Sequence, residues 1–185
     1  MFELNSSQDK KIINFVKLSG KLKKLPRSGW LMKVGVKDPE SVAEHIFGTS
    51  VLCMLIGDLK HIDTSKMIRM ALLHDLCESI TGDLMPGMSK RKNEDNAMKK
   101  ILSYLPEQVK KYYHEIWNDY YNRKSEESEI VRELDKLEMA FQALYYEENG
   151  YDKRLLSGFW KTSDSVIKDP YVRQLFNSLK NEIKP

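Results

Sequence analysis

The stretch ALLHDLCESITGDLMP, residues 71–86, decides how the rest of the chain is interpreted. Its first half has the apolar spacing of a helix that enters a hydrophobic core. It nevertheless carries His74, Asp75 and Glu78, and Asp83 follows just past the expected end of that helix. A buried carboxylate without a partner costs several kcal/mol. Such a cluster must therefore meet cations or stay hydrated in a cleft.

The spacing of these residues places them on one flank of the expected helix. His74 and Glu78 are four residues apart, and Asp75 and Glu78 are three apart, so the members of each pair adjoin. Imidazole and carboxylate groups together suit Mn, Co, Fe, Zn or Ni, and suit Mg less well. A divalent metal ion would satisfy this cluster, with further ligands from elsewhere in the chain.

Two distant residues are candidates for those further ligands. The segment SVAE at 41–44 matches a capping box, so a helix begins there and His45 lies in its first turns. Asp135 lies beside the apolar face of a long expected helix over residues 126–148. Each has an ordinary alternative explanation, because a single helical histidine is more often structural and ELDKLE resembles a salt-bridged helix face.

Helical periodicity extends over almost the whole chain, and no segment alternates strictly for the length of a strand. We expect an all-α helical bundle that forms a single domain over residues 1–185, since this length and a hydrophobic content of 41% suffice for one core. The expected helices cover about residues 8–19, 41–59, 64–80, 94–104, 106–122, 126–148 and 170–182, separated by a basic linker over 22–40 and a loop over 81–92.

Composition narrows the functional classes. The sequence has no run of about 18 apolar residues and no signal-peptide pattern, so we expect a soluble, cytoplasmic protein with no membrane partner. Cys53 and Cys77 lie in apolar helical patterns and are expected to be buried free thiols. The basic run over residues 10–37 favours anionic ligands or is simply a solvated lysine-rich face. Nucleic acid is not expected, because aromatic residues are not interleaved with this run.

Four separate blocks of the sequence resemble one known family. The blocks are LPRSGW, PESVAEH, ALLHDLCESITGD and ELDKLEMAFQA, and they occur in the family order between about residues 10 and 150. They resemble the HD-domain superfamily of metal-dependent phosphohydrolases, which are all-helical proteins. Within it, they are most similar to the 5′-deoxynucleotidase branch, which implies removal of phosphate from deoxynucleoside 5′-monophosphates by a protein that forms a homodimer.

The resemblance also implies a set of site residues. They are four ligands of one divalent ion (His45, His74, Asp75 and Asp135), a catalytic acid pair (Glu78 and Asp83) and two substrate-contacting residues (Arg27 and Trp30). A divalent ion lowers the pKa of a water that it binds and withdraws charge from phosphoryl oxygens. Asp83 is then the expected acceptor of the water's proton, with Glu78 in support or in proton transfer to the leaving oxygen. Arg27 would bind phosphate oxygens through its rigid fork.

Two alternative functions stay open. The same site would serve an enzyme of another nucleotide, such as a cyclic nucleotide, a nucleoside triphosphate or a guanosine polyphosphate. It would also serve a metal- or nucleotide-binding module without turnover, although such a module has no need of the acid pair. A zinc-protease motif HExxH is not matched, because HDLCE carries Glu78 in place of the second histidine. His61 and His114 match none of the four blocks.

Overall fold

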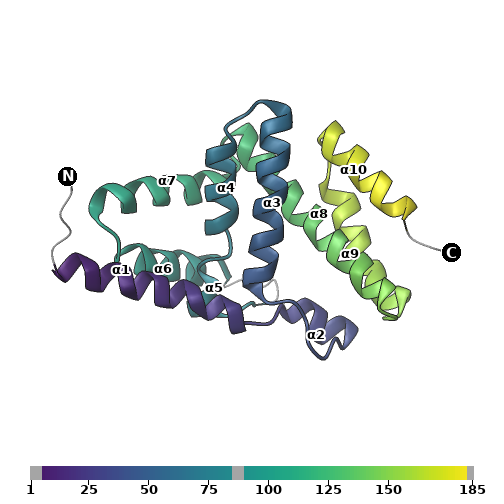
Figure 1. Ribbon diagram of the computed structural model, residues 1–185, viewed down its shortest axis with the longest axis horizontal. Coiled ribbons are helices and arrows are strands. Elements are labelled where there is room, and N and C mark those ends of the chain that lie inside the picture. The colour runs from purple at the N-terminus through teal and green to yellow at the C-terminus, as the bar shows by residue number, and fades with distance from the viewer. Residues whose placement is uncertain (1–5, 85–89, 183–185) are drawn as a thin grey trace.

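The computed structural model describes residues 6–84 and 90–182, and in these two ranges the regular elements are helices (Figure 1). The all-α prediction is therefore confirmed. The elements in chain order are α1 (Ser6–Ser19), the 3₁₀ helix η1 (Gly20–Lys24), α2 (Ser28–Val34), α3 (Val42–Lys60), α4 (Thr64–Leu73), α5 (Glu78–Thr81), α6 (Lys90–Leu102), α7 (Glu107–Asn122), α8 (Glu126–Glu148), α9 (Lys153–Val166) and α10 (Pro170–Asn181).

Helix α8 is the element around which the others are arranged. It contacts α3, α4 and α7 on one side and α9 and α10 on the other, and α3 packs closely along α4. In Figure 1, α3 and α4 stand at the centre of the molecule, α9 and α10 lie on the side of the C-terminus, and α1 and α6 lie on the opposite side. Side chains from α3, α8 and the segment after α4 can therefore meet in the interior.

Capping residues fix where three of these helices begin, and the predicted capping box is present before α3. The Ser41 hydroxyl accepts the Glu44 N–H at 3.2 Å, and the Glu44 carboxylate accepts the Ser41 N–H at 2.6 Å, which completes the capping box. Asp63 caps α4 and Ser125 caps α8 through side-chain acceptors. Each such cap contributes about 1 kcal/mol. The box before α3 places His45 in the first turns of that helix.

The helix predicted over residues 64–80 is not continuous, because residues 74–77 form turns between α4 and α5. Helix α4 ends at Leu73, and backbone N–H groups then bond to carbonyls three residues back, as from Leu76 to Leu73 at 3.2 Å and from Glu78 to Asp75 at 3.0 Å. Three residues per turn bring side chains at positions i and i+3 one above the other. Asp75 and Glu78 therefore adjoin through this tightened turn rather than through an α-helix.

The expected linker over residues 22–40 contains the last residues of η1 and all of α2, so this prediction is also wrong. The segment is fixed by contacts that are distant in sequence. The Ser28 N–H donates to the Asp83 carboxylate at 2.7 Å, and the Ser28 hydroxyl donates to the Asp83 carbonyl at 2.5 Å. Such contacts leave no periodic signal in the segment itself.

One further helix and one helix boundary differ from expectation. Helix α9 was not predicted, although Asp152 caps its start and Leu156 and Phe159 bury its inner face against α8. The loop predicted over residues 81–92 is shorter at its far end, because α6 begins at Lys90. Residues 85–89 of that loop lie outside the described residues.

Two apolar clusters form the core. The larger one joins α3, α4, α7, α8 and α10, and the smaller one joins α2, α8 and α9 around Trp30. Cys53 and Cys77 are buried and form no disulfide within the described residues, in agreement with the prediction. Among the described helices, α3 has the length and hydropathy of a membrane span. It also packs along α4 and α8 and contributes Cys53 and Ile56 to the larger cluster, as core helices do.

Candidate metal centre

Two buried histidines meet at the centre of the bundle. His45 comes from α3 and His74 from the turn after α4, and their Nε2 atoms lie 3.4 Å apart. The Nδ1 atom of His74 lies 2.7 Å from the Ala71 carbonyl oxygen, and the Nδ1 atom of His45 contacts the Glu138 carboxylate. Carbonyl and carboxylate oxygens accept hydrogen bonds, so each Nδ1 carries the hydrogen. Both rings thus direct Nε2 at a shared point.

Two carboxylates adjoin this point. An oxygen of Asp135, from α8, lies 3.2 Å from Nε2 of His45. An oxygen of Asp75 lies 3.2 Å from Nε2 of His74 and 3.8 Å from Nε2 of His45. One donor atom from each of His45, His74 and Asp135 falls within 4.8 Å of the others. Nitrogen and oxygen donors of this kind suit a divalent transition metal.

The charges around His45 also fit a cation at this point. Burial and the nearby Arg27 lower the pKa of His45, but hydrogen bonds with Asp135 and Glu138 outweigh them and raise it to about 10. Burial acts to raise the pKa of Asp135, yet Lys136 and His45 hold it well below its usual value. A raised histidine pKa next to ionised carboxylates shows that the side chains at this point carry an excess of negative charge. A divalent ion would supply that positive charge and leave the imidazole neutral.

A cavity of about 210 Å³ opens beside these donors. Acidic and basic side chains line it together. The lining consists of four acids (Asp75, Glu78, Asp83 and Asp135), three bases (Arg27, Lys33 and Lys136) and five uncharged residues (Gly29, Trp30, Leu84, Met139 and Phe159). The structure therefore brings the predicted acid pair and the predicted substrate-contacting residues to one cavity, next to two of the predicted ligands.

Each of the three basic side chains in the cavity contacts a neighbouring carboxylate or aromatic ring. Arg27 lies at the N-cap of α2, and its Nη1 atom is 3.1 Å from Asp75. Burial lowers the pKa of Arg27, but Asp75 and the other cavity carboxylates raise it by more. The net pKa is above the ordinary arginine value, so the guanidinium stays charged. Lys136 bonds to Asp135 at 2.9 Å, and Lys33 lies over the Phe159 ring. Lys33 and Lys136 were not predicted as cavity residues.

Trp30 forms a wall of this cavity with very little exposed surface. Only 1% of the residue is exposed, its ring stacks on Phe159 with centroids 3.9 Å apart, and its indole N–H donates to Glu40 at 2.7 Å. Because that donor is already used, Trp30 has only a ring edge to offer a ligand. Its contact with substrate stays a prediction.

The sequence-based prediction missed two buried acids behind His45. Glu138 follows Asp135 by three residues on α8, so both lie on one face of the helix, and this spacing is a signal that could have identified it. Glu40 lies in the PESVAEH block, next to the cap of α3. Burial and the neighbouring Glu138 raise the pKa of Glu40 to about 7, against the opposing effects of His45 and Arg27.

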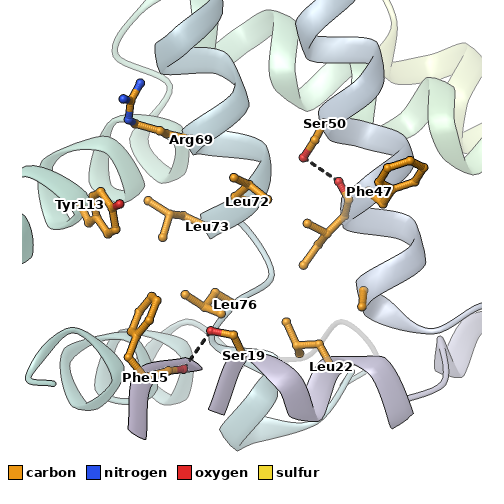
Figure 2. A pocket seen from close by; sticks show the side chains of 12 residues that line it. Phe15, Ser19, Leu22, Phe47, Ser50, Arg69, Leu72, Leu73, Leu76 and Tyr113 are labelled. Carbon is orange, nitrogen blue, oxygen red and sulfur yellow. Dashed lines mark hydrogen bonds between the residues drawn. The ribbon is translucent and has the colours of Figure 1, made fainter. Parts of the chain in front are cut away.

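A larger cavity, of about 420 Å³, lies between α1, α3, α4 and α7, and Figure 2 shows its lining. The hydroxyls of Ser19 and Ser50 are bonded to carbonyls of their own helices, to Phe15 at 3.0 Å and to Ile46 at 2.8 Å. The rest of the lining is mainly hydrocarbon, and the described residues that line it include none of the predicted site residues. The smaller cavity is therefore the one suited to phosphate chemistry.

Comparisons with known proteins find relatives over most of the chain. A family model for the HD domain matches residues 19–173. The mouse protein named 5'-deoxynucleotidase HDDC2 is 35% identical over 176 residues, which cover 92% of this chain and 87% of the mouse protein. The Dictyostelium discoideum protein of the same name is 35% identical over 187 residues, which cover 93% of this chain and 98% of that protein.

A solved structure is similar over nearly the whole length. It is a conserved hypothetical protein from Pyrococcus furiosus, 31% identical, with a TM-score of 0.75 over 91% of this chain and 99% of that one. The family model and the curated relatives each span most of the chain. The chain belongs to the HD-domain family.

Proposed function

We propose that this protein is a divalent-metal-dependent phosphohydrolase that removes the 5′-phosphate from deoxynucleoside monophosphates, with the whole chain acting as one HD domain. One observation carries the proposal: the histidine and aspartate donors adjoin a cavity in which paired acids lie with fixed positive charges. The relatives named 5'-deoxynucleotidase support the substrate class.

In this proposal His45, His74, Asp75 and Asp135 hold one divalent ion. When bound, the ion withdraws charge from the phosphoryl oxygens and makes water more acidic. The protein's part is to keep the imidazoles oriented, as the Ala71 carbonyl does for His74 through its Nδ1 contact.

The acid pair moves protons in this proposal. Asp83 accepts the proton of the attacking water, and the Ser28 N–H, at 2.7 Å, keeps its carboxylate in place. Glu78, buried beside the cavity and one tight turn after Asp75, supports the water or gives a proton to the leaving 5′-oxygen. Both groups lie on the segment that follows α4, so their separation is set by a short stretch of backbone.

Substrate position depends on Arg27, whose planar fork matches two phosphate oxygens. We expect Arg27→Lys to lower kcat/KM about 10- to 100-fold, mainly through KM, since hydrogen bonds between charged groups contribute about 1.5–3 kcal/mol. Steady-state phosphate release checks this result. Lys24→Ala, which removes an exposed lysine of the same basic segment, is the control and should change neither constant. An Arg27→Lys enzyme with unchanged KM would remove Arg27 from phosphate binding.

The substrate class is tested by phosphate release from a panel of nucleotides. The panel contains 5′- and 3′-monophosphates in deoxy and ribo forms, a triphosphate, a cyclic nucleotide and a guanosine polyphosphate. The proposal predicts release from deoxynucleoside 5′-monophosphates and little from the 3′-isomers. If the protein prefers the triphosphate, the cyclic nucleotide or the polyphosphate, the proposed site would stand but the proposed substrate would be wrong.

We further propose that two copies of the chain associate through the outer face of α3. Apolar side chains at i, i+4, i+7 and i+8 form a stripe on this helix that is 41–70% exposed, and it consists of Phe47, Val51, Met54 and Leu55. Phe47 also lines the larger cavity, so the stripe begins at the edge of that cavity. A second copy would cover this surface, as large exposed apolar patches commonly require. A cytoplasmic location fits this soluble assembly and two cysteines that form no disulfide with each other.

The dimer is tested by a charge placed in the stripe. Leu55→Asp is expected to yield a monomer in analytical ultracentrifugation, because an unpaired buried carboxylate opposes association. Leu155→Asp on α9 is the matched control, since Leu55 is 51% exposed and Leu155 is 48% exposed. A wild-type protein that sediments as a monomer, or a Leu55→Asp protein that remains a dimer, would contradict this interface.

A further inference from the structure

Glu138 lies against the metal centre without belonging to its predicted donors. Its carboxylate contacts Nδ1 of His45, the ring atom that faces away from the other donors. His45 is fully buried and Glu138 is 7% exposed. Glu138 is also absent from the residues that line the cavity of about 210 Å³, so it has no direct access to a substrate there.

The two histidines of the centre are held by different acceptors. His74 donates its Nδ1 hydrogen to a main-chain carbonyl, that of Ala71, which belongs to its own turn. His45 donates to a side chain on another helix, α8, and that side chain is a carboxylate. A carboxylate acceptor both fixes the tautomer and makes the opposite ring nitrogen a stronger donor to a metal ion. His45 therefore depends on a residue that a mutation can remove.

Helix α3 has a gap in its side chains where Glu138 fits. A Cβ atom placed on Gly48 would lie 2.8 Å from a carboxylate oxygen of Glu138 and 2.9 Å from its Cγ atom. Gly48 is inside the helix, where glycine is about 1 kcal/mol less favourable than alanine. Its lack of a side chain therefore serves the contact between α3 and α8, one helical turn after His45.

Besides His45 and Gly48, Glu40 also lies next to the Glu138 carboxylate. One donor atom each from Glu40, His45 and Glu138 falls within 4.8 Å of the others. Glu40 is itself held in place, because it accepts the Trp30 indole N–H at 2.7 Å and its own N–H donates to the Tyr146 hydroxyl at 2.8 Å. Glu138 is thus confined between a helix backbone, a fixed carboxyl group and the imidazole.

We propose that Glu138 is a positioning residue for the metal centre: it holds His45 with Nε2 directed at the ion, and Gly48 provides the space that admits it. This inference rests on the proposed function, because it requires that His45 be a metal ligand. It adds to that function a determinant of metal affinity that touches neither the ion nor the substrate.

Metal affinity of the folded protein tests this inference independently of turnover. Chelator-stripped protein is titrated with Co²⁺, and both calorimetry and the visible absorption of bound Co²⁺ are recorded. We expect Glu138→Ala to bind Co²⁺ about 10- to 100-fold more weakly, as is usual when the partner of a ligating histidine is lost. The Co²⁺ absorption should shift as well, since the His45 ring is free to turn.

Two milder variants separate positioning from simple loss of structure. Glu138→Gln keeps the shape and an acceptor oxygen for Nδ1–H but loses the charge, so its loss of affinity should be smaller than that of Glu138→Ala. Gly48→Ala displaces Glu138 without changing any charge and should weaken Co²⁺ binding too. The control is Glu133→Gln, a buried glutamate on the same helix that accepts the Asp169 N–H at 2.8 Å, and it should leave the affinity unchanged.

Three results would overturn the inference. The first is a folded Glu138→Ala protein with the wild-type affinity and absorption spectrum. The second is a wild-type chain that binds two ions, of which Glu138→Ala loses one while the other keeps its affinity, because Glu40, His45 and Glu138 would then be ligands themselves. The third is a wild-type protein that binds no divalent ion, which would overturn the proposed function and this inference together. The first result would leave the proposed function standing, and the second would keep the phosphohydrolase but replace its single ion by two.

Discussion

Asp75→Ala is expected to reduce phosphate release to background and to release the bound ion. An oxygen of Asp75 faces Nε2 of both His74 and His45, at 3.2 Å and 3.8 Å, and also holds Arg27 at 3.1 Å. Removal of this carboxylate takes one ligand from the ion and leaves the guanidinium without its partner. Metal content per chain and phosphate release, measured on the same preparation, check both effects.

The control for this experiment is Asp38→Ala, which removes an exposed carboxylate from the segment before α3. It should keep the wild-type metal content and rate. Circular dichroism of Asp75→Ala should retain the helical signal, because the carboxylate is not part of either apolar cluster. An Asp75→Ala protein that keeps the ion and the full rate would remove Asp75 from the centre.

Glu78→Ala is expected to keep the ion and to lose about 10²- to 10⁴-fold in kcat, the usual contribution of a positioned acid or base. Glu78 is 3% exposed and lines the cavity, three residues after Asp75. In the proposed mechanism this carboxylate acts on the water or the leaving oxygen and does not bind the ion. Metal content and kcat at saturating substrate check this separation.

Glu78→Gln sharpens the result, since it preserves the shape of the side chain and removes its proton exchange. It should resemble Glu78→Ala in rate and the wild type in metal content. Full activity in either variant would exclude Glu78 from the mechanism. Loss of the ion in both would make Glu78 a ligand instead.

Sequence reasoning succeeded where the structure is determined by neighbouring residues. The starts of α3, α4 and α8 follow from Ser41, Asp63 and Ser125, each of which bonds to a backbone N–H within three residues. The burial of Cys53 and Cys77 follows from local apolar spacing in the same way. These features are local, so the sequence alone contains the information that fixes them.

Other features depend on contacts between distant segments and were missed. Helix α2 is tied to the segment after α4 through Ser28 and Asp83, which are 55 residues apart. The turn after Leu73 departs from α-helical bonding where the chain must direct side chains inward, and no periodic pattern marks that change. Glu40 and Glu138 meet His45 only after α3 and α8 pack, although the i+3 spacing from Asp135 already indicated the face on which Glu138 lies.

The central claim is that one divalent ion, held by His45, His74, Asp75 and Asp135, is required for phosphate release. The most direct test titrates Mn²⁺ or Co²⁺ into chelator-stripped protein and measures bound metal and phosphate release from a deoxynucleoside 5′-monophosphate in the same samples. The rate should be at background without metal and should rise in proportion to bound ion until it saturates at one ion per chain. Full activity in stripped protein, or no release from folded protein that carries the ion, would contradict the claim.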